Sequence, residues 1–413
     1  MRPEPRSGGP LRLLILYETL YPEHAGGIET RNHELARALA GRGHVVTLAG
    51  FGLPAPASAA VDGEVGRVER RLLGDPRTLY DQDGRRRHRR ALGFALRALT
   101  IAPAEYDVVE TASVPFFHLP GIAAACRAAR VPLLVVWYEV WGAYWKSYVG
   151  AARAPVYRLL ERAAARLGRR VAATSALGRD RLAGMRASGR NAAGGDVALA
   201  PCGVDLAALR RAVEEPAAPP PGPPIVAAGR LLAHKRLDLL LDALPHLADL
   251  DAGPGGAPLA AGAPLVAIFG DGPERARLEA RAERLGMRDR VLFHGQVASL
   301  AEVWRGFAAA RVAVHPSARE GFGLVPLEAM AAGLPVVHCR SQESAVGELV
   351  RDGVEGLLTE PTPAALAGGI RALLADEPRR RALAAAAQIR AAEYSWERLA
   401  VDYERLLLGL AQG

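Results

Sequence analysis

Two glutamates, Glu320 and Glu328, stand eight positions apart in the stretch REGFGLVPLEAMAAGLPVV, with only glycine, proline and apolar side chains between them. Gly321 and Gly323 allow a ligand to come close to the backbone, because glycine has no Cβ. A helix expected to begin near Leu324 would present the unpaired N–H groups of its first turn to phosphate oxygens. The stretch therefore predicts a site that can cradle a diphosphate.

The two carboxylates suit hydroxyl groups. Glu328 would lie one turn inside the expected helix, where burying an ionised carboxylate is costly unless donors surround it. Ribose hydroxyls are suitable donors, and Glu320 in the loop could accept hydrogen bonds from a second ring. The alternative is an ordinary solvent-facing pair of glutamates, but the Gly-x-Gly between them favours the ligand interpretation.

Cations that could neutralise a diphosphate occur in the segment GRLLAHKRLD. Arg230 directly follows a predicted strand, and Lys235 comes five residues later. Lys235 and Lys146 are the only lysines among 52 basic residues, which favours positions where a compact point charge is needed. In GGIET, Gly26 and Gly27 occupy the first predicted strand-to-helix turn and could admit a phosphate, although a lone Gly-Gly is weak evidence.

The elements around these residues indicate two α/β domains. LRLLILYE (residues 11–18) reads as a buried strand, GGIETRNHELARALAGRGH as an amphipathic helix and VVTLAG as a second strand, which together form a βαβ unit. YDVVET, VPLLVVW, RRVAATS and DVALAP continue the pattern, and PIVAAGR, PLVAIFG, VLFHG and VAVHPS begin it again. Apolar strands that alternate with helices predict doubly wound, Rossmann-like parallel sheets.

We expect the following domain boundaries: an N-terminal domain over 1–213 with a disordered leader over 1–10, a proline-rich linker over 214–224, a C-terminal domain over 225–390 and a terminal helix over 391–413. Ligands of open α/β sheets bind beyond the carboxyl ends of the strands. The site is therefore expected in a cleft between the two domains.

Composition narrows the function classes. The 413 residues suit two domains, the hydrophobic fraction is 50%, and no apolar run is long enough to span a bilayer. MRPEPRSGGP has no apolar core of a signal peptide, so a cytoplasmic location is expected. The net charge of +8 suits an anionic partner or reflects arginine bias, and no nucleic-acid recognition motif is present. Three widely spaced cysteines, expected to be reduced core residues, are Cys126, Cys202 and Cys339.

GGIE, GRLLAHKRLD, FGDGPE, FHGQV and HPSAREGFGLVPLEAMAAGLPVV together resemble, in order, the motifs of glycosyltransferase family 4. These are retaining nucleotide-sugar enzymes of the GT-B fold, and YSWERLAVDYERLL resembles the terminal helix that crosses back to the first domain. The resemblance implies that Arg230 and Lys235 bind and stabilise the leaving diphosphate, without a metal or another cofactor, and that Glu328 holds the ribose. It further implies that Glu320 and the backbone N–H groups of Phe322, Gly323 and Leu324 contact the sugar and phosphates, and that the segment from His294 to Val297 flanks the base.

One position departs from the family pattern. After the strand VPLLVV the family often has a histidine that touches the donor sugar, and this chain has Tyr138 there, followed by Glu139. Tyrosine donates a hydrogen bond but is a poor general base near neutral pH. A retaining reaction needs no protein base when the leaving phosphate oxygen takes the acceptor proton, so Tyr138 stays a catalytic candidate.

The same segment is rich in aromatic residues. Trp137, Trp141 and Trp145 recur every four residues beside two tyrosines, and Lys146 lies among them. Aromatic faces suit sugar rings, so Glu139, Trp141, Trp145 and Lys146 are candidates for acceptor binding. The alternative is core packing, which is the usual fate of an aromatic stripe.

The run GRRRHRRALGFALRAL (residues 84–99) is basic and leads into an amphipathic helix. It could dock on an anionic membrane at the inner face, or it could be a solvated helix face, which is the more common case. His118, in VPFFHLPG, is expected to be a packed histidine.

These observations favour a retaining hexosyltransferase of carbohydrate biosynthesis. It would move a sugar from a UDP-, GDP- or TDP-linked donor to a hydroxyl of a glycolipid, polysaccharide or secondary metabolite. Two alternatives stay open: a catalytically weak partner that only binds nucleotide sugar, and an epimerase or phosphorylase of the same fold. The base, the sugar, the acceptor and the oligomeric state are not specified by the sequence.

Overall fold

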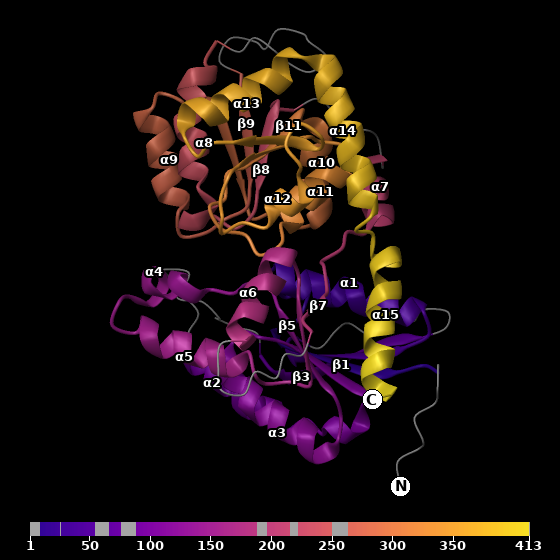
Figure 1. Cartoon of the computed structure of the whole chain (residues 1–413). Helices are drawn as coiled ribbons and strands as arrows, with labels where there is room; N and C mark the ends of the chain where they lie inside the picture. The colour runs from indigo at the N-terminus through magenta and orange to yellow at the C-terminus, as the bar shows by residue number, and fades with distance from the viewer. Residues whose placement is uncertain are drawn as a thin grey trace. The chain divides into compact units, whose positions relative to one another are not determined.

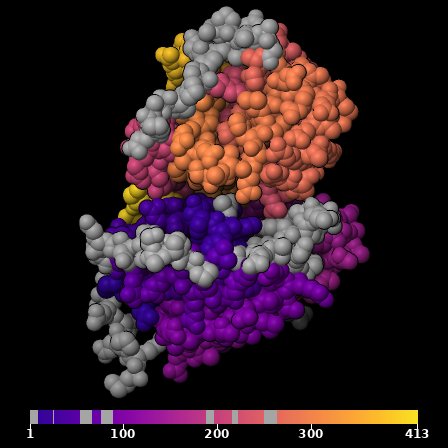
Figure 2. All heavy atoms as spheres, turned by 180° about the vertical axis from the view of Figure 1, so that it is seen from behind, coloured from indigo at the N-terminus to yellow at the C-terminus, as the bar shows by residue number. Residues whose placement is uncertain are grey.

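The computed structural model describes residues 9–24, 26–53, 66–75, 88–187, 196–214, 222–249 and 263–412, and the other residues are grey in Figures 1 and 2. Most of the expected leader (1–10) and linker (214–224), and the start of the basic run (84–87), therefore lie outside the described residues. The described chain divides into two compact units. The first unit comprises residues up to 203 together with those from 396 onward, and the second comprises 204–395.

The first unit contains a seven-stranded sheet in the order β3-β2-β1-β4-β5-β6-β7, in which all neighbouring strands are parallel. The central strands are buried on both faces, which explains their continuous apolar sequences. The strands are β1 Arg12–Thr19, β2 Val45–Phe51, β3 Arg67–Gly74, β4 Val108–Ala112, β5 Leu133–Trp137, β6 Arg170–Ala173 and β7 Ala198–Leu199.

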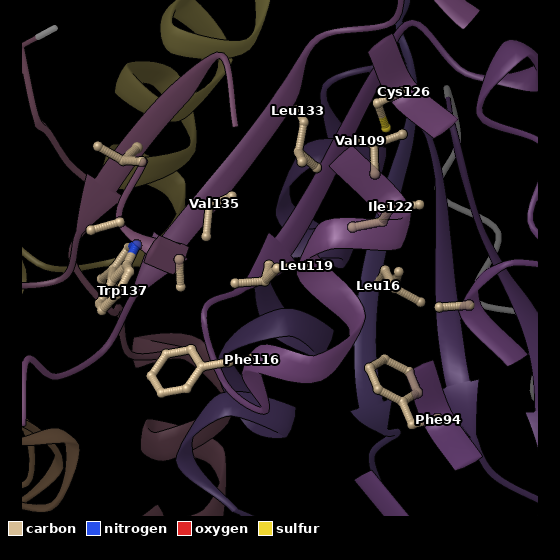
Figure 3. Close-up of a cluster of buried hydrophobic side chains, with 14 of the residues drawn as sticks. Leu16, Phe94, Val109, Phe116, Leu119, Ile122, Cys126, Leu133, Val135 and Trp137 are labelled. Carbon is tan, nitrogen blue, oxygen red and sulfur yellow. The ribbon is translucent and has the colours of Figure 1, made fainter. Parts of the chain in front are cut away.

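Helices cover both faces of this sheet. One face packs in a large core that includes Phe94, Phe116 and Trp137, and Figure 3 shows these rings beside strand residues such as Val135. On the opposite face α1 and α15 lie side by side (Figure 1). The helices are α1 Gly27–Gly41, α2 His88–Ala98, α3 Leu119–Ala129, α4 Trp145–Val149, α5 Ala154–Ala164, α6 Ala176–Ala187 and α15 Trp396–Gln412, with short 3-10 helices η1 Pro103–Glu105, η2 Phe116–His118 and η3 Gly142–Tyr144.

The second unit contains a six-stranded parallel sheet in the order β10-β9-β8-β11-β12-β13. Its strands are β8 Ile225–Ala228, β9 Val266–Phe269, β10 Val291–Gly295, β11 Val312–His315, β12 Val336–Cys339 and β13 Gly356–Thr359. Its helices are α7 Leu206–Glu214, α8 Leu237–Ala243, α9 Arg275–Arg284, α10 Leu300–Ala309, α11 Leu324–Ala331, α12 Val346–Leu349, α13 Pro363–Ala375 and α14 Glu377–Ala392, with η4 Ala233–Lys235, η5 Leu244–Leu247 and η7 Arg288–Arg290.

The expected fold class, two Rossmann-like α/β domains with a returning terminal helix, is confirmed. The division of the chain differs from the expected one in detail, because Val204–Glu214 groups with the second unit rather than the first. Helix α7 packs on α10, and Arg305 donates a hydrogen bond to the carbonyl of Ala212 at 3.0 Å. The terminal helix begins at Trp396 rather than at 391.

No helix among the described residues is both long enough and apolar enough to span a membrane. The three cysteines are buried and form no disulfide, as expected.

Candidate functional site

The loop between β11 and α11, which carries Glu320, is held in place by several hydrogen bonds. The amide of Glu320 donates to the carbonyl of Glu343 at 3.2 Å, and its carbonyl accepts from the amide of Ala345 at 2.8 Å. Ser317 Oγ donates to the carbonyl of Arg319 at 2.7 Å. The position of the Glu320 side chain is therefore set by a loop with little freedom.

Two cationic or polar groups converge on one oxygen of Glu320. Lys235 Nζ lies 2.5 Å from Glu320 Oε2, and His315 Nε2 lies 3.0 Å from the same atom. A carboxylate only accepts hydrogen bonds, so His315 must carry its proton on Nε2. Both of these hydrogen bonds within the described residues go to Oε2, and the side chain is 17% exposed, so Oε1 can accept from a ligand.

The electrostatics keep Glu320 ionised. Burial by itself would raise the pKa of Glu320, but Lys235 and His315 hold that pKa well below its ordinary value. Burial lowers the pKa of His315, so its ring is neutral at pH 7. His338 Nδ1 donates to the carbonyl of His315 at 2.5 Å and ties the end of β11 to β12. Sequence reasoning missed His315 and His338, and the only available signal was the histidine that directly precedes Pro316.

The start of α11 offers free backbone donors. Gly323 is the N-cap residue with φ +109°, a conformation that favours glycine, and no side chain caps the helix. The first-turn amides of Leu324 and Val325 have no acceptor within the helix. Phe322 is buried edge-on against Tyr394, with ring centroids 5.7 Å apart, which holds the backbone at this turn.

Glu328 has a pKa that is shifted in the opposite direction from that of Glu320. Its side chain belongs to the buried face of α11, and the residue is only 8% exposed. Burial raises the pKa of Glu328 to about 8, and the nearby Trp304 indole lowers it only partly. Trp304 Nε1 makes no hydrogen bond of normal geometry within the described part of the chain. The carboxyl group is thus desolvated and lacks a strong donor, which a ligand hydroxyl could supply.

Arg230 follows β8 in a tightly packed turn. Gly229 and Gly270 have φ values of +126° and +122°, and a Cβ on Gly270 would lie 2.1 Å from the carbonyl oxygen of Gly229. The turns after β8 and β9 therefore need glycine in order to pack together. Asp271 Oδ1 accepts from the amide of Gly272 at 2.6 Å, which agrees with its expected role as a turn former.

The base-flanking candidates lie at the end of β10. His294 is exposed and stacks on Phe269, with ring centroids 4.2 Å apart and an interplanar angle of 2°. Val297 is partly exposed two residues after the strand. Since β10, β9, β8 and β11 are neighbours in a parallel sheet, the segments that follow them lie at the carboxyl ends of the strands. The structure thus brings the second-unit candidates to the same end of this sheet.

In the first unit, the glycine pair begins α1. Gly26 is the N-cap residue, and a Cβ there would lie 2.4 Å from Glu29 Oε2. Glu29 is itself buried and accepts a hydrogen bond from Thr19 Oγ1 at 2.6 Å. A side chain at position 26 would therefore displace the folded-back Glu29 carboxylate, and Gly27 is the first residue of the helix.

Tyr138 is held by α1 rather than poised as a base. Its hydroxyl donates to Asn32 Oδ1 at 3.2 Å, an atom that also accepts from Arg31 at 3.1 Å. Burial raises the pKa of Tyr138 well above its ordinary value. The group can donate a hydrogen bond, but it cannot take a proton near neutral pH, as the sequence predicts.

A buried polar network lies behind Tyr138. Arg31 and Glu110 form an ion pair in which each residue is 1% exposed, and Tyr403 of α15 donates to Glu110 Oε2 at 2.6 Å. The guanidinium of Arg31 also lies over the Tyr403 ring, 5.0 Å from its centroid. The network joins residues 31, 110 and 403, and no local sequence pattern could have shown it.

A buried carboxylate organises the tryptophan segment. Glu161 of α5 accepts hydrogen bonds from the amides of Trp141 and Gly142 at 2.7 and 2.9 Å, and from Trp145 Nε1 at 3.0 Å. Trp145 is 4% exposed and belongs to the core, which favours the packing alternative for this ring. Trp141 and Glu139 are partly exposed and Lys146 is exposed, so these three side chains stay candidates for acceptor contact.

His118 is a packed histidine, as expected. It is 2% exposed, its Nδ1 is hydrogen-bonded to the carbonyl of Pro115, and its Nε2 lies 2.7 Å from Thr111 Oγ1. Both ring nitrogens are thus used inside the unit.

Comparison with known proteins agrees with this fold. A model described as "Glycosyltransferase Family 4" matches residues 25–208, and one described as "Glycosyl transferases group 1" matches residues 211–390. A D-inositol 3-phosphate glycosyltransferase of Xylanimonas cellulosilytica is 37% identical over 224 residues, 49% of this chain and 48% of that protein. A GDP-mannose-dependent alpha-(1-6)-phosphatidylinositol dimannoside mannosyltransferase of Mycobacterium tuberculosis is 35% identical over 180 residues, 43% of this chain and 42% of that protein. The matched part thus spans about half or less of these relatives.

Solved structures share the fold over nearly the whole chain. Sucrose-phosphate synthase of Thermosynechococcus elongatus superposes with a TM-score of 0.73 at 23% identity, covering 97% of this chain and 98% of the other. HepE of Anabaena, solved in complex with UDP and glucose, has a TM-score of 0.67 at 22% identity, covering 97% and 100%. The two family models and the paired Rossmann-like sheets lead to one conclusion: the chain belongs to glycosyltransferase family 4 and has the GT-B fold.

Proposed function

We propose that this glycosyltransferase is retaining and metal-independent, and that it transfers a hexose from a nucleoside diphosphate sugar to an acceptor hydroxyl. The observation that carries the proposal is the arrangement of Lys235 and Glu320 beside the uncapped start of α11, with the desolvated Glu328 one turn further on. A cation and free amides suit a diphosphate, and two carboxyl groups suit the hydroxyls of two rings.

Each donor-site residue has a distinct task in this proposal. Lys235 and Arg230 neutralise the diphosphate as it leaves, and the backbone N–H groups of Phe322, Gly323 and Leu324 donate hydrogen bonds to phosphate oxygens. Oxygen Oε1 of Glu320 accepts from a sugar hydroxyl, because Oε2 is already engaged by Lys235 and His315. The Glu328 carboxyl accepts from the ribose. The segment from His294 to Val297 and the glycines at 26, 27 and 321 border the ligand.

The bond changes balance without a protein base. The acceptor oxygen bonds to the anomeric carbon on the face from which the carbon–phosphate oxygen bond breaks, and the acceptor proton passes to a phosphate oxygen of the leaving nucleotide. Tyr138, which is protonated at neutral pH, acts as a hydrogen-bond donor. The acceptor would be held by the first unit, with Glu139, Trp141 and Lys146 as contact residues.

The experiment is a transfer assay with UDP-, GDP- and TDP-sugars and with candidate acceptors that include D-inositol 3-phosphate and phosphatidylinositol dimannoside, after which two relatives are named. Product stereochemistry determined by NMR should show the configuration of the donor retained, and EDTA should leave the rate unchanged. Inversion of configuration would contradict the retaining mechanism. A rate that falls with EDTA and returns with a divalent cation would contradict metal independence.

Tyr138, which stands where the family often has a histidine and donates to Asn32 Oδ1, favours one second candidate, a protein that binds nucleotide sugar and transfers it poorly. Thermal stabilisation by a nucleoside diphosphate sugar, with neither hydrolysis nor transfer across the acceptor panel, would support this candidate.

A further inference from the structure

Six large apolar side chains are exposed on adjacent segments of the first unit. Leu92, Leu96 and Leu99 are 55%, 61% and 56% exposed and follow one another at spacings of four and three residues, so they form one stripe along α2 and the residue just after it. Val156 and Leu159 of α5 are 58% and 67% exposed. The sixth, in η2, is Phe117 at 40%.

These segments are neighbours in space. Helix η2 contacts both α2 and α5, and α2 contacts α3, while Figure 1 shows α5, α2 and α3 following one another along one side of the first unit. A Cβ on Gly121 of α3 would lie 2.6 Å from Leu99 Cδ2, so this leucine lies directly against α3. We call the surface formed by the six apolar residues and the exposed arginines beside them the leucine–arginine face.

The exposed charges that α2, α3 and α5 contribute to this face have one sign, although the exposed Asp75 lines the same hollow as Arg97. Arg89 and Arg97 of α2 and Arg162 of α5 are exposed. The sequences of α2, α3 and α5 contain a single acidic residue, Glu161, which is 1% exposed and occupied by three N–H donors of the tryptophan segment. The exposed parts of these helices are therefore apolar or cationic.

We infer that the leucine–arginine face docks on the surface of an anionic phospholipid bilayer, with its leucines among the acyl chains and its arginines at the phosphates. An amphipathic helix with basic residues beside an apolar stripe lies in the plane of a membrane interface. A two-fold contact with a second copy is disfavoured, because a self-complementary interface would bring like charges together. The inference does not depend on the proposed transferase activity.

The test is sedimentation of the full chain with vesicles of phosphatidylcholine alone and with vesicles that also contain phosphatidylglycerol. The wild type should bind the anionic vesicles more tightly, and high salt should weaken binding. The triple variant L92Q/L96Q/L159Q should lower the partition coefficient by at least about tenfold, since several partly inserted apolar side chains are lost. The triple variant R89Q/R97Q/R162Q should lower it by about a hundredfold, or about fivefold per arginine.

A matched control lies on the second unit. Ile389 is 72% exposed on α14, and the side chain of Arg381 on the same helix is 74% exposed, so I389Q/R381Q should bind as the wild type does. The melting temperature of each variant, measured by circular dichroism, distinguishes misfolding from loss of membrane binding. A variant with a lower melting temperature than the wild type is replaced by the corresponding single substitutions. Failure of the wild type to bind anionic vesicles would overturn the inference. Normal vesicle binding by the face variants would also overturn it. So would a wild-type protein that forms a concentration-dependent dimer and binds no vesicles, if the face variants abolish that dimer.

Discussion

Lys235 and Glu320, which are 85 positions apart in the chain, form an ion pair with an Nζ–Oε2 distance of 2.5 Å. The pair lies beyond the carboxyl ends of the central strands β8 and β11. The lysine approaches one carboxylate oxygen and leaves the other to a ligand. In the proposed reaction the lysine must serve two anions, the fixed carboxylate and the departing diphosphate.

We expect Lys235→Met to lower kcat/KM by a factor of about 100 to 1,000, the loss typical for one preorganised electrostatic group. Lys235→Arg should also lose most activity, because a planar fork does not replace a point charge. The side chains of this pair are only 20% and 17% exposed, so Lys235→Met, which leaves Glu320 without its cation, should also melt earlier than the wild type, and its kinetics are measured below its melting transition. Steady-state kinetics together with melting curves provide the measurement, and near-normal kcat/KM in Lys235→Met would remove the lysine from the site.

Stability should fall as the pH rises from about 4.5 to about 8, because the Glu328 carboxyl is protonated in the folded state and ionised in the unfolded chain across this range. The folded state binds more protons there, so the free energy of unfolding decreases with pH by up to about 1.4 kcal/mol per unit from this group. The free energy of unfolding, measured by denaturant titration at several pH values, should fall with pH in the wild type more steeply than in Glu328→Gln across this window. Identical pH profiles would contradict the assignment.

Binding of a nucleoside diphosphate at pH 7 should release a proton, because ribose hydroxyls that donate to Glu328 favour its ionised form. Calorimetry in two buffers of different ionisation enthalpy measures this release. In Glu328→Gln the release should disappear and affinity should fall. If the wild type bound the nucleotide with no proton exchange, the ribose would not be at Glu328.

The buried network of the first unit should be costly to break. Glu110→Ala leaves Arg31 buried without its partner and should cost about 3–5 kcal/mol, whereas Tyr403→Phe removes one hydrogen bond and should cost about 1–3 kcal/mol. Arg405 lies on the same helix, and its ion pair with Asp402 is 73% and 68% exposed, so Arg405→Ala should stay within about 0.5 kcal/mol. Equal effects of Glu110→Ala and Arg405→Ala in urea unfolding would contradict the network.

Trp145 and Trp141 should respond differently to replacement by alanine. Trp145 is buried in the core, so its loss should cost about 3–5 kcal/mol of stability. Trp141 is partly exposed, and its loss should raise the KM for the acceptor while leaving the KM for the donor unchanged. A Trp141→Ala enzyme with normal acceptor kinetics would leave the segment with a packing role only.

The sequence predicts the central strands well, because strands buried on both faces have continuous apolar runs, as in β1 and β5. It misses β3, whose sequence RVERRLLG is charged because the strand lies at the sheet edge and most of its side chains meet water. The local motif predicts a loop with Glu320 and a helix with Glu328. It could not predict that His315 shares an oxygen of Glu320 with Lys235, or that Arg31 pairs with Glu110, because such contacts depend on segments brought together only by folding.

Because α15 packs on the first unit, the first unit cannot complete its fold during synthesis until the end of the chain has been made. Residues 396–412 are synthesised only after the whole of the second unit, yet they cover apolar side chains of strands made at the beginning. Until they emerge, one face of the earliest sheet lacks part of its cover and Glu110 lacks the hydroxyl of Tyr403. A nascent chain halted before Trp396 should therefore be a client for chaperones and a target for proteases, even though the first sheet has all of its strands.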